Sequence, residues 1–119
     1  MLSHEIIWLA EPEEHDYPEA ESYLSLKFDP SRALQLIGAL REAHIQHIKA
    51  KDILRASGLA PLPATNKHVR HNRKKIREGK ALSPILLVRG EPTLIADGYH
   101  RVCAVYRHDE DAPIPCKLV

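Results

Sequence analysis

Two short apolar runs in the second half of the chain limit what it can fold into more than any other feature. The first covers residues 84–88 (PILLV) and the second covers residues 93–96 (TLIA). The turn sequence Gly90-Glu91-Pro92 separates them. Each run is short, apolar throughout and bounded by turn-forming residues, which is typical of a strand buried in a sheet. The pattern therefore predicts a hairpin of two buried strands.

Upstream of this hairpin, one helix is clearly marked. Asp29 followed by Pro30 is a helix start, because the carboxylate can cap the first turn and proline lacks an N–H that would otherwise be unsatisfied. Apolar residues then recur at three- and four-residue spacing, which predicts an amphipathic helix over residues 30–43. The next segment, 44–63, fits both a strand and a helix, and Gly58, Pro61 and Pro63 end whichever forms.

A second helix is predicted just before the hairpin. Thr65 or Asn66 can cap it, it runs to Glu78, and Gly79 stands in the usual position beyond its end. Only Val69 and Ile76 form its apolar stripe. The rest of its surface is basic, so we expect this helix to lie at the surface.

The elements after the hairpin complete the fold class. Residues 98–107 carry a short apolar helical stripe, and residues 114–119 are typical of a closing strand. The order of helices and strands is mixed, which predicts an α+β domain and not a doubly wound sheet. A chain of 119 residues fits one compact domain.

The N-terminal segment, residues 1–28, holds a short apolar stretch, Ile6 to Leu9, followed by an acidic run. Its acidic run EPEEHDYPEAE contains two prolines, so we expect a surface loop or at most a short helix.

The net charge of +1 gives no overall attraction to nucleic acid. No apolar run approaches the roughly 20 residues of a membrane-spanning helix, and we expect a cytoplasmic protein with no membrane partner. Cys103 and Cys116 are expected to be free thiols.

The junction between the second strand and the last helix is the candidate binding site. The apolar run ends at Asp97-Gly98, and the cations His100 and Arg101 follow at a helix N-terminus, where cations are disfavoured. A phosphate bound to the first-turn amides and to the Arg101 fork would explain this placement. Asp97 would then cap the helix or reach a ligand hydroxyl or a metal ion. Alternatively, Asp97 is a plain cap, and the cations are exposed or paired with residues 109–111.

The same residues carry a resemblance to a known family. The sequence SPILLVRGEPTLIADGYHRVCAVY, preceded by HVRHNRKKIREGKAL and followed by IPCKLV, resembles the core of the ParB/sulfiredoxin superfamily. In that superfamily a strand ends in a Gly-x-x-Arg motif, which reads Gly-Glu-Arg-Arg in ParB-type proteins and Asp-Gly-His-His-Arg in a free serine kinase. This chain reads Asp97-Gly98-Tyr99-His100-Arg101.

The resemblance implies a small mixed sheet with helices packed around it. Residues 48–119 would form the core and residues 1–47 an N-terminal helical extension of one domain, 1–119. It further implies a nucleotide site, for ATP, ADP or CTP with Mg²⁺, formed by Asp97, Gly98, Tyr99, His100 and Arg101. Phosphoryl transfer or nucleotide hydrolysis is the corresponding activity. Sulfinate reduction is not expected, because Tyr99 stands where sulfiredoxin has its catalytic cysteine.

If the protein is an enzyme, its candidate catalytic residues are Asp52 and His100. Asp52 falls where the first strand of the superfamily lines the pocket, and alternatively pairs with neighbouring cations. No structural metal is predicted, because neither His44 with His47 nor His68 with His71 has a clear third ligand.

Two other functions stay open. One is a non-catalytic DNA-binding or nuclease-like module, and the other is an interaction protein of the toxin–antitoxin kind that uses the acidic N-terminal segment. For DNA, the candidate contacts with backbone phosphates are the cations of the basic helix, Arg70, Arg73, Lys74, Lys75 and Arg77. The same cations also fit a solvated helix face or an extension of the phosphate pocket.

Overall fold

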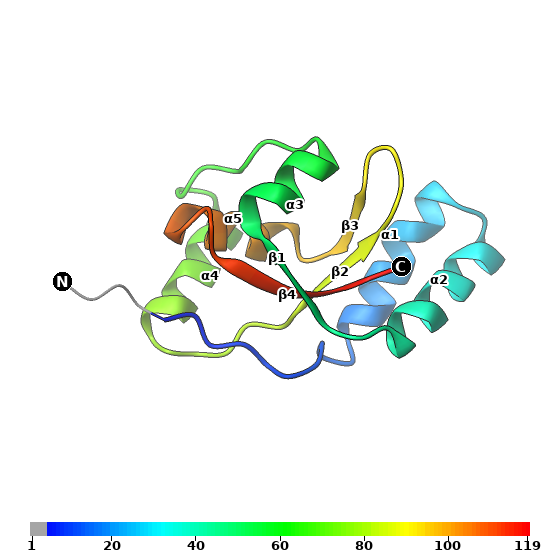
Figure 1. Cartoon of the computed structure of the whole chain (residues 1–119), viewed down its shortest axis with the longest axis horizontal. Helices are drawn as coiled ribbons and strands as arrows, with labels where there is room; N and C mark the ends of the chain where they lie inside the picture. The colour runs from blue at the N-terminus through cyan, green and yellow to red at the C-terminus, as the bar shows by residue number, and fades with distance from the viewer. Residues whose placement is uncertain (1–4) are drawn as a thin grey trace.

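The computed structural model describes residues 5–119, and every structural statement below refers to this part of the chain. Residues 1–4 of the predicted domain lie outside it. The elements in chain order are α1 (Asp16–Lys27), α2 (Pro30–Glu42), β1 (Gln46–Lys49), α3 (Ala50–Ser57), α4 (Lys67–Arg77), β2 (Ile85–Val88), β3 (Leu94–Asp97), α5 (Tyr99–His108) and β4 (Pro113–Leu118). Figure 1 shows their arrangement, with the α1–α2 pair at one end of the molecule.

The four strands form one mixed sheet in the order β1-β4-β2-β3. β1 and β4 are antiparallel, with Ile48 opposite Ile114. β4 and β2 run parallel, whereas β2 and β3 are antiparallel, with Leu87 opposite Ile95. The hairpin predicted from the two apolar runs is therefore confirmed, and so is the α+β class.

The continuous apolar sequence of β2 reflects burial on both faces of the sheet. Successive side chains of a strand point to opposite faces. Ile85 and Leu87 pack into the cluster beneath α3, α4 and α5. Leu86 and Val88 pack into the second cluster, beneath α1 and α2. This central strand thus joins the two halves of the core.

Local capping signals account for the well-predicted helices. The Asp29 carboxylate accepts a hydrogen bond from the Arg32 amide at the start of α2, and the Asn66 side chain accepts two at the start of α4. Gly79 follows α4 with a φ of +70°. Residues 44–63, whose sequence fitted a strand and a helix equally, contain one of each. The strand β1 ends at Lys49, and the helix α3 begins at Ala50.

The expectation of a surface loop or at most a short helix for the acidic run was wrong. Residues Asp16–Lys27 form the twelve-residue helix α1, and its face with Tyr17, Ala20 and Leu24 is buried against the sheet. Pro18 lies in the first turn of this helix, where its missing N–H breaks no hydrogen bond. The acidic run is therefore partly a core-packing element, and it carries one buried carboxylate, Asp16.

Cys103 and Cys116 are free and buried, as predicted. Burial raises the pKa of the Cys116 thiol to about 11, and it also raises the pKa of Cys103. Both thiols are therefore protonated at neutral pH and serve as small core residues. Over residues 5–119, none of the helices has the length and apolar character needed to cross a membrane.

Candidate functional site

Gly98 makes the turn between β3 and α5. Its φ of +110° lies in a region that residues with a side chain rarely adopt. A Cβ atom at this position would stand 2.4 Å from Cδ1 of Ile85 and 3.1 Å from Nη2 of Arg101. Glycine is thus favoured here both by the backbone conformation and by the close approach of the Ile85 and Arg101 side chains.

Arg101 does not extend into solvent from the first turn of α5. Its side chain is 14% exposed, and Nη2 donates to Asp97 Oδ2 at 2.6 Å. Nη1 donates to the Ser83 carbonyl at 2.7 Å and lies 3.5 Å from Asp16 Oδ2. The cation at the helix N-terminus is therefore balanced by two carboxylates of the chain itself, and neither of them belongs to residues 109–111.

Asp16 is the most buried of the site residues that the sequence did not reveal, which also include Glu19 and Ser83. It lies at the start of α1 and is 3% exposed, and the Ser83 hydroxyl donates a hydrogen bond to its Oδ2. The Ser83 hydroxyl in turn accepts a hydrogen bond from the Glu13 amide at 3.0 Å. These contacts join the start of α1 to the segment before β2 and fix the carboxylate beside Arg101.

The protonation of Asp97 is sensitive to this arrangement. Burial raises the pKa of its carboxyl to about 7, the Arg101 guanidinium opposes the shift, and the Asp16 carboxylate adds to it. The side chain is 12% exposed. Asp97 consequently changes charge near neutral pH.

A third carboxylate completes an acidic triad of Asp16, Glu19 and Asp97. One carboxylate oxygen from each lies within 4.8 Å of the others. Asp16 and Glu19 come from α1, and Asp97 ends β3. Oxygen ligands grouped in this way are of the type that hard divalent cations prefer. The triad is thus the group of residues that could hold Mg²⁺.

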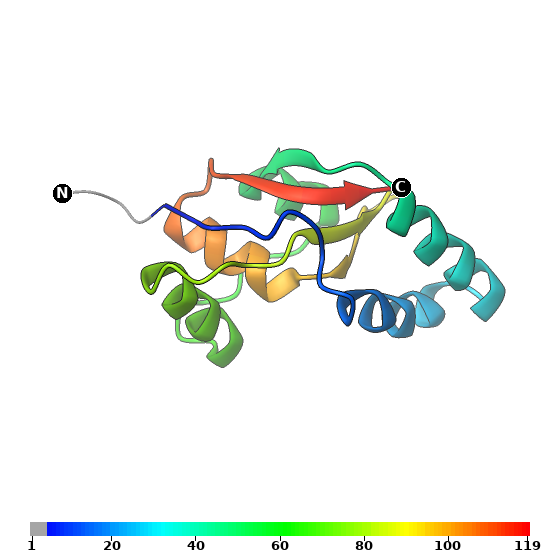
Figure 2. The same cartoon turned by 90° about the horizontal axis from the view of Figure 1, so that it is seen from below.

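A polar cleft of about 440 Å³ lies beside the triad, between α1 and α4. Asp16 and Glu19 line one wall, and His68, His71 and Lys75 line the other. The cleft continues into a smaller hollow of about 190 Å³ at residues 97–101, which shares Glu19 and His68 with it. Figure 2 shows α1 and α4 on either side of the first turn of α5. One wall is therefore acidic and the other carries basic groups.

His100 is part of the hollow at the first turn of α5. Its ring lies 4.7 Å from the His68 ring and 5.8 Å from the Tyr99 ring, measured between centroids. Burial and the neighbouring His68 lower the pKa of His100, so the neutral imidazole predominates at pH 7. A neutral imidazole can both donate and accept a hydrogen bond. The five residues predicted as a binding motif, 97–101, all line this hollow.

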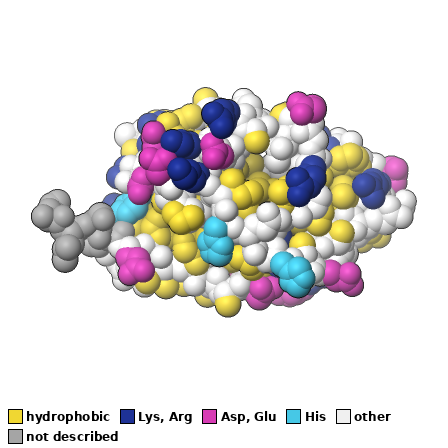
Figure 3. Space-filling view, viewed as in Figure 1, with side chains coloured by type: hydrophobic (Ala, Val, Ile, Leu, Met, Phe, Trp, Pro, Cys, Tyr) yellow, Lys and Arg dark blue, Asp and Glu magenta, His cyan; other side chains and the backbone are white. Residues whose placement is uncertain are grey.

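The cations of α4 do not all face the cleft. Lys75 lines the cleft, whereas Lys74 lies 4.0 Å from Glu78 on the exposed part of the helix. Three other predicted DNA contacts, Arg70, Arg73 and Arg77, are not among the cleft-lining residues of the described chain. The molecular face in Figure 3 shows Lys and Arg interspersed with Asp and Glu. Elsewhere in the described chain Lys51 Nζ lies 2.7 Å from Asp111 Oδ1.

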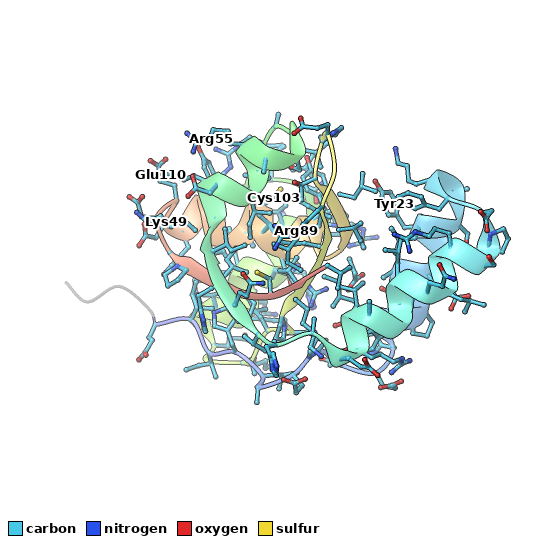
Figure 4. The ribbon with its side chains drawn as sticks, turned by 45° about the vertical axis from the view of Figure 1, so that its right-hand side comes forward. Tyr23, Lys49, Arg55, Arg89, Cys103 and Glu110 are labelled. Atoms are coloured by element: carbon cyan, nitrogen blue, oxygen red, sulfur yellow. The ribbon has the colours of Figure 1, made fainter. Side chains whose placement is uncertain are left out.

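Asp52, the other candidate catalytic residue, lies apart from this site. It belongs to α3 and pairs with Arg55 at 3.1 Å. It lines a small apolar hollow of about 110 Å³ together with Arg89 and Thr93, and this hollow shares no lining residue with the cleft. Figure 4 places Arg55 on α3 and Arg89 after β2. The structure thus brings His100 to the candidate site and leaves Asp52 outside it.

Comparisons with protein-family models, curated proteins and solved structures give no match to this chain.

Proposed function

We propose that this protein binds a phosphate compound of the nucleotide class, together with Mg²⁺, in the cleft between α1 and α4. The observation that carries the proposal is the two-sided character of the cleft. Asp16 and Glu19 of the acidic triad line one wall, Lys75 with two histidines lines the other, and Asp97 lines the adjoining hollow. The resemblance of residues 97–101 to the phosphate-binding motif of the ParB/sulfiredoxin superfamily supports the same ligand class.

The acidic wall suits the cation. Mg²⁺ usually takes one or two protein carboxylates and completes its coordination with water and phosphate oxygens. Asp16 is held by Ser83 and Arg101, and Asp97 is held by Arg101, so Glu19 is the triad carboxylate best able to supply a protein ligand. Bound there, Mg²⁺ would neutralise phosphate charge.

The opposite wall and the helix start suit the phosphate. Lys75 supplies a full positive charge, and His68 and His71 supply further hydrogen-bond donors. The N-terminus of α5 adds partial positive charge from its first-turn amides. Arg101 is engaged with Asp97 and Asp16, so we assign it the role of positioning these two carboxylates and not that of a free phosphate ligand.

Thermal unfolding with ATP, ADP, CTP and GTP, each with and without Mg²⁺, tests this proposal. A ligand present at 100 times its Kd stabilises the folded state by about 2.7 kcal/mol. We expect a Mg²⁺-dependent rise in Tm that is lost in Lys75→Ala and loses its Mg²⁺ dependence in Glu19→Gln. Lys74→Ala is the matched control, because Lys74 is adjacent in sequence but lies outside the cleft, and it should leave the rise intact.

Two results would contradict the proposal: no shift with any nucleotide, or an equal loss in Lys74→Ala and Lys75→Ala. If Lys74→Ala and Lys75→Ala reduce the rise in Tm equally, and the protein also binds duplex DNA in a salt-sensitive way, the DNA-binding alternative is favoured. Phosphate release, measured on whichever nucleotide binds, separates hydrolysis from binding alone.

A further inference from the structure

An apolar groove adjoins the hollow at the first turn of α5. It has a volume of about 420 Å³, and its apolar lining comes from Tyr23, Leu59, Ile95, Ala96 and Tyr99. The groove also shares Glu19 and residues 97–100 with the hollow. A single ligand can therefore occupy both spaces, with its charged part on the polar side and an apolar part in the groove.

We propose that this groove binds the aromatic ring of the phosphate ligand, so that the protein selects ring-bearing phosphate esters over inorganic phosphates. This inference rests on the proposed function, because it concerns the rest of the same ligand. It assigns the groove to the ring of a nucleotide and makes Tyr23 and Leu59 specificity-determining residues.

The two tyrosines are held in place from opposite halves of the core. Tyr99 packs against the cluster beneath α3, α4 and α5, and its hydroxyl donates to the Ala60 carbonyl at 2.5 Å. Tyr23 packs against the other cluster and projects from α1 toward the β2–β3 hairpin (Figure 4). Rings that are fixed before binding lose little entropy when a ligand stacks on them.

Leu59 provides an independent reason to expect an apolar ligand. It follows the end of α3 and is 43% exposed at the groove. An exposed leucine is unremarkable by itself, but here it lies beside two tyrosines and a buried isoleucine. Covering these side chains with a planar ring would remove apolar surface from water, which favours binding.

The test compares ligands that share the charge but differ in the ring. Calorimetric titration with MgATP and with magnesium tripolyphosphate measures what the ring adds. Stacking of a base on an aromatic side chain is worth about 1–3 kcal/mol, so we expect MgATP to bind about ten to a hundred times more tightly. Leu59→Ser and Tyr23→Ala should each reduce this ratio and leave tripolyphosphate binding unchanged.

Leu26→Ser is the matched control, because Leu26 lies on α1, is 84% exposed and does not line the groove. It should leave both affinities unchanged. If Tyr23→Ala fails to fold, Leu59→Ser still tests the groove, since its side chain is partly exposed. Equal affinities for the two ligands, or a ratio unchanged in Leu59→Ser, would overturn the inference while leaving the proposed function intact. Binding of neither ligand would overturn both.

Discussion

Replacing Arg101 with alanine should destabilise the protein through its carboxylate partners. The guanidinium lies 2.6 Å from Asp97 and 3.5 Å from Asp16, and these three side chains are between 4% and 14% exposed. Removing one partner of a buried ion pair leaves uncompensated charge and typically costs about 3–5 kcal/mol. Because Asp97 can take up a proton in the variant, we expect the lower figure, about 3 kcal/mol at pH 8.

The same loss can be expressed as a change in Tm. Unfolding entropies near 2.1 cal/mol/K per residue give about 0.25 kcal/mol/K for a chain of this length. A loss of about 3 kcal/mol therefore corresponds to a fall in Tm of about 12 °C. The loss should be smaller at pH 5, because Asp97, with a pKa of about 7, is already neutral there in the wild-type protein.

Arg107→Ala is the control for this experiment. Arg107 is an exposed residue of the same helix, and its guanidinium donates to the carbonyls of Leu62 and Pro61. Urea unfolding at pH 5 and pH 8 measures both variants. Equal losses for Arg101→Ala and Arg107→Ala, or a loss in Arg101→Ala that does not change with pH, would refute the assignment of Arg101 to the buried carboxylates.

Three further changes test the turn at Gly98, the titration of Asp97 and the buried lysine of β4, Lys117. Gly98→Ala should lower the free energy of unfolding by about 2–4 kcal/mol, from positive φ and the overlap with Ile85. Gly58→Ala is the control, because Gly58 also has a positive φ, +70°, but no atom lies within 4 Å of an added Cβ. In the urea assay it should lower the free energy of unfolding by only about 1 kcal/mol. The raised pKa of Asp97 means that stability falls as pH rises from about 4 to about 7, and Asp97→Asn should flatten this part of a Tm–pH profile. Lys117→Ala should lower the free energy of unfolding, measured by chemical denaturation, by about 3 kcal/mol, because the aliphatic part of the side chain is buried and its Nζ donates to the Arg41 carbonyl. Lys117→Met keeps most of the buried apolar surface and should recover part of this loss.

Most elements could be predicted because their signals are local. The caps at Asp29 and Asn66 and the apolar run of β2 are each contained within a few residues. The segment around Lys49 and Ala50 was ambiguous for a physical reason, since the chain changes there from strand to helix without a loop. A stretch of sequence that spans this junction therefore shows both the two-residue periodicity of a strand and the 3.6-residue periodicity of a helix.

The site was only half predictable. Asp97 and Arg101 lie four positions apart on either side of the Gly98 turn, in the motif that the sequence already marked as the candidate site. The contribution of Asp16 could not be inferred from the sequence, because it depends on how α1 packs against the sheet. A narrow stripe of Tyr17, Ala20 and Leu24 within a strongly acidic sequence was the only signal for that packing.

The contact between Asp16 and Arg101 has a consequence for how related chains should vary. A carboxylate and a guanidinium that balance each other in a buried setting can change safely only as a pair. We therefore expect positions 16 and 101 to covary among homologues, with Ser83 following Asp16. Chains that keep the motif at 97–101 but lack α1 should carry a compensating acid elsewhere or a neutral residue in place of the arginine.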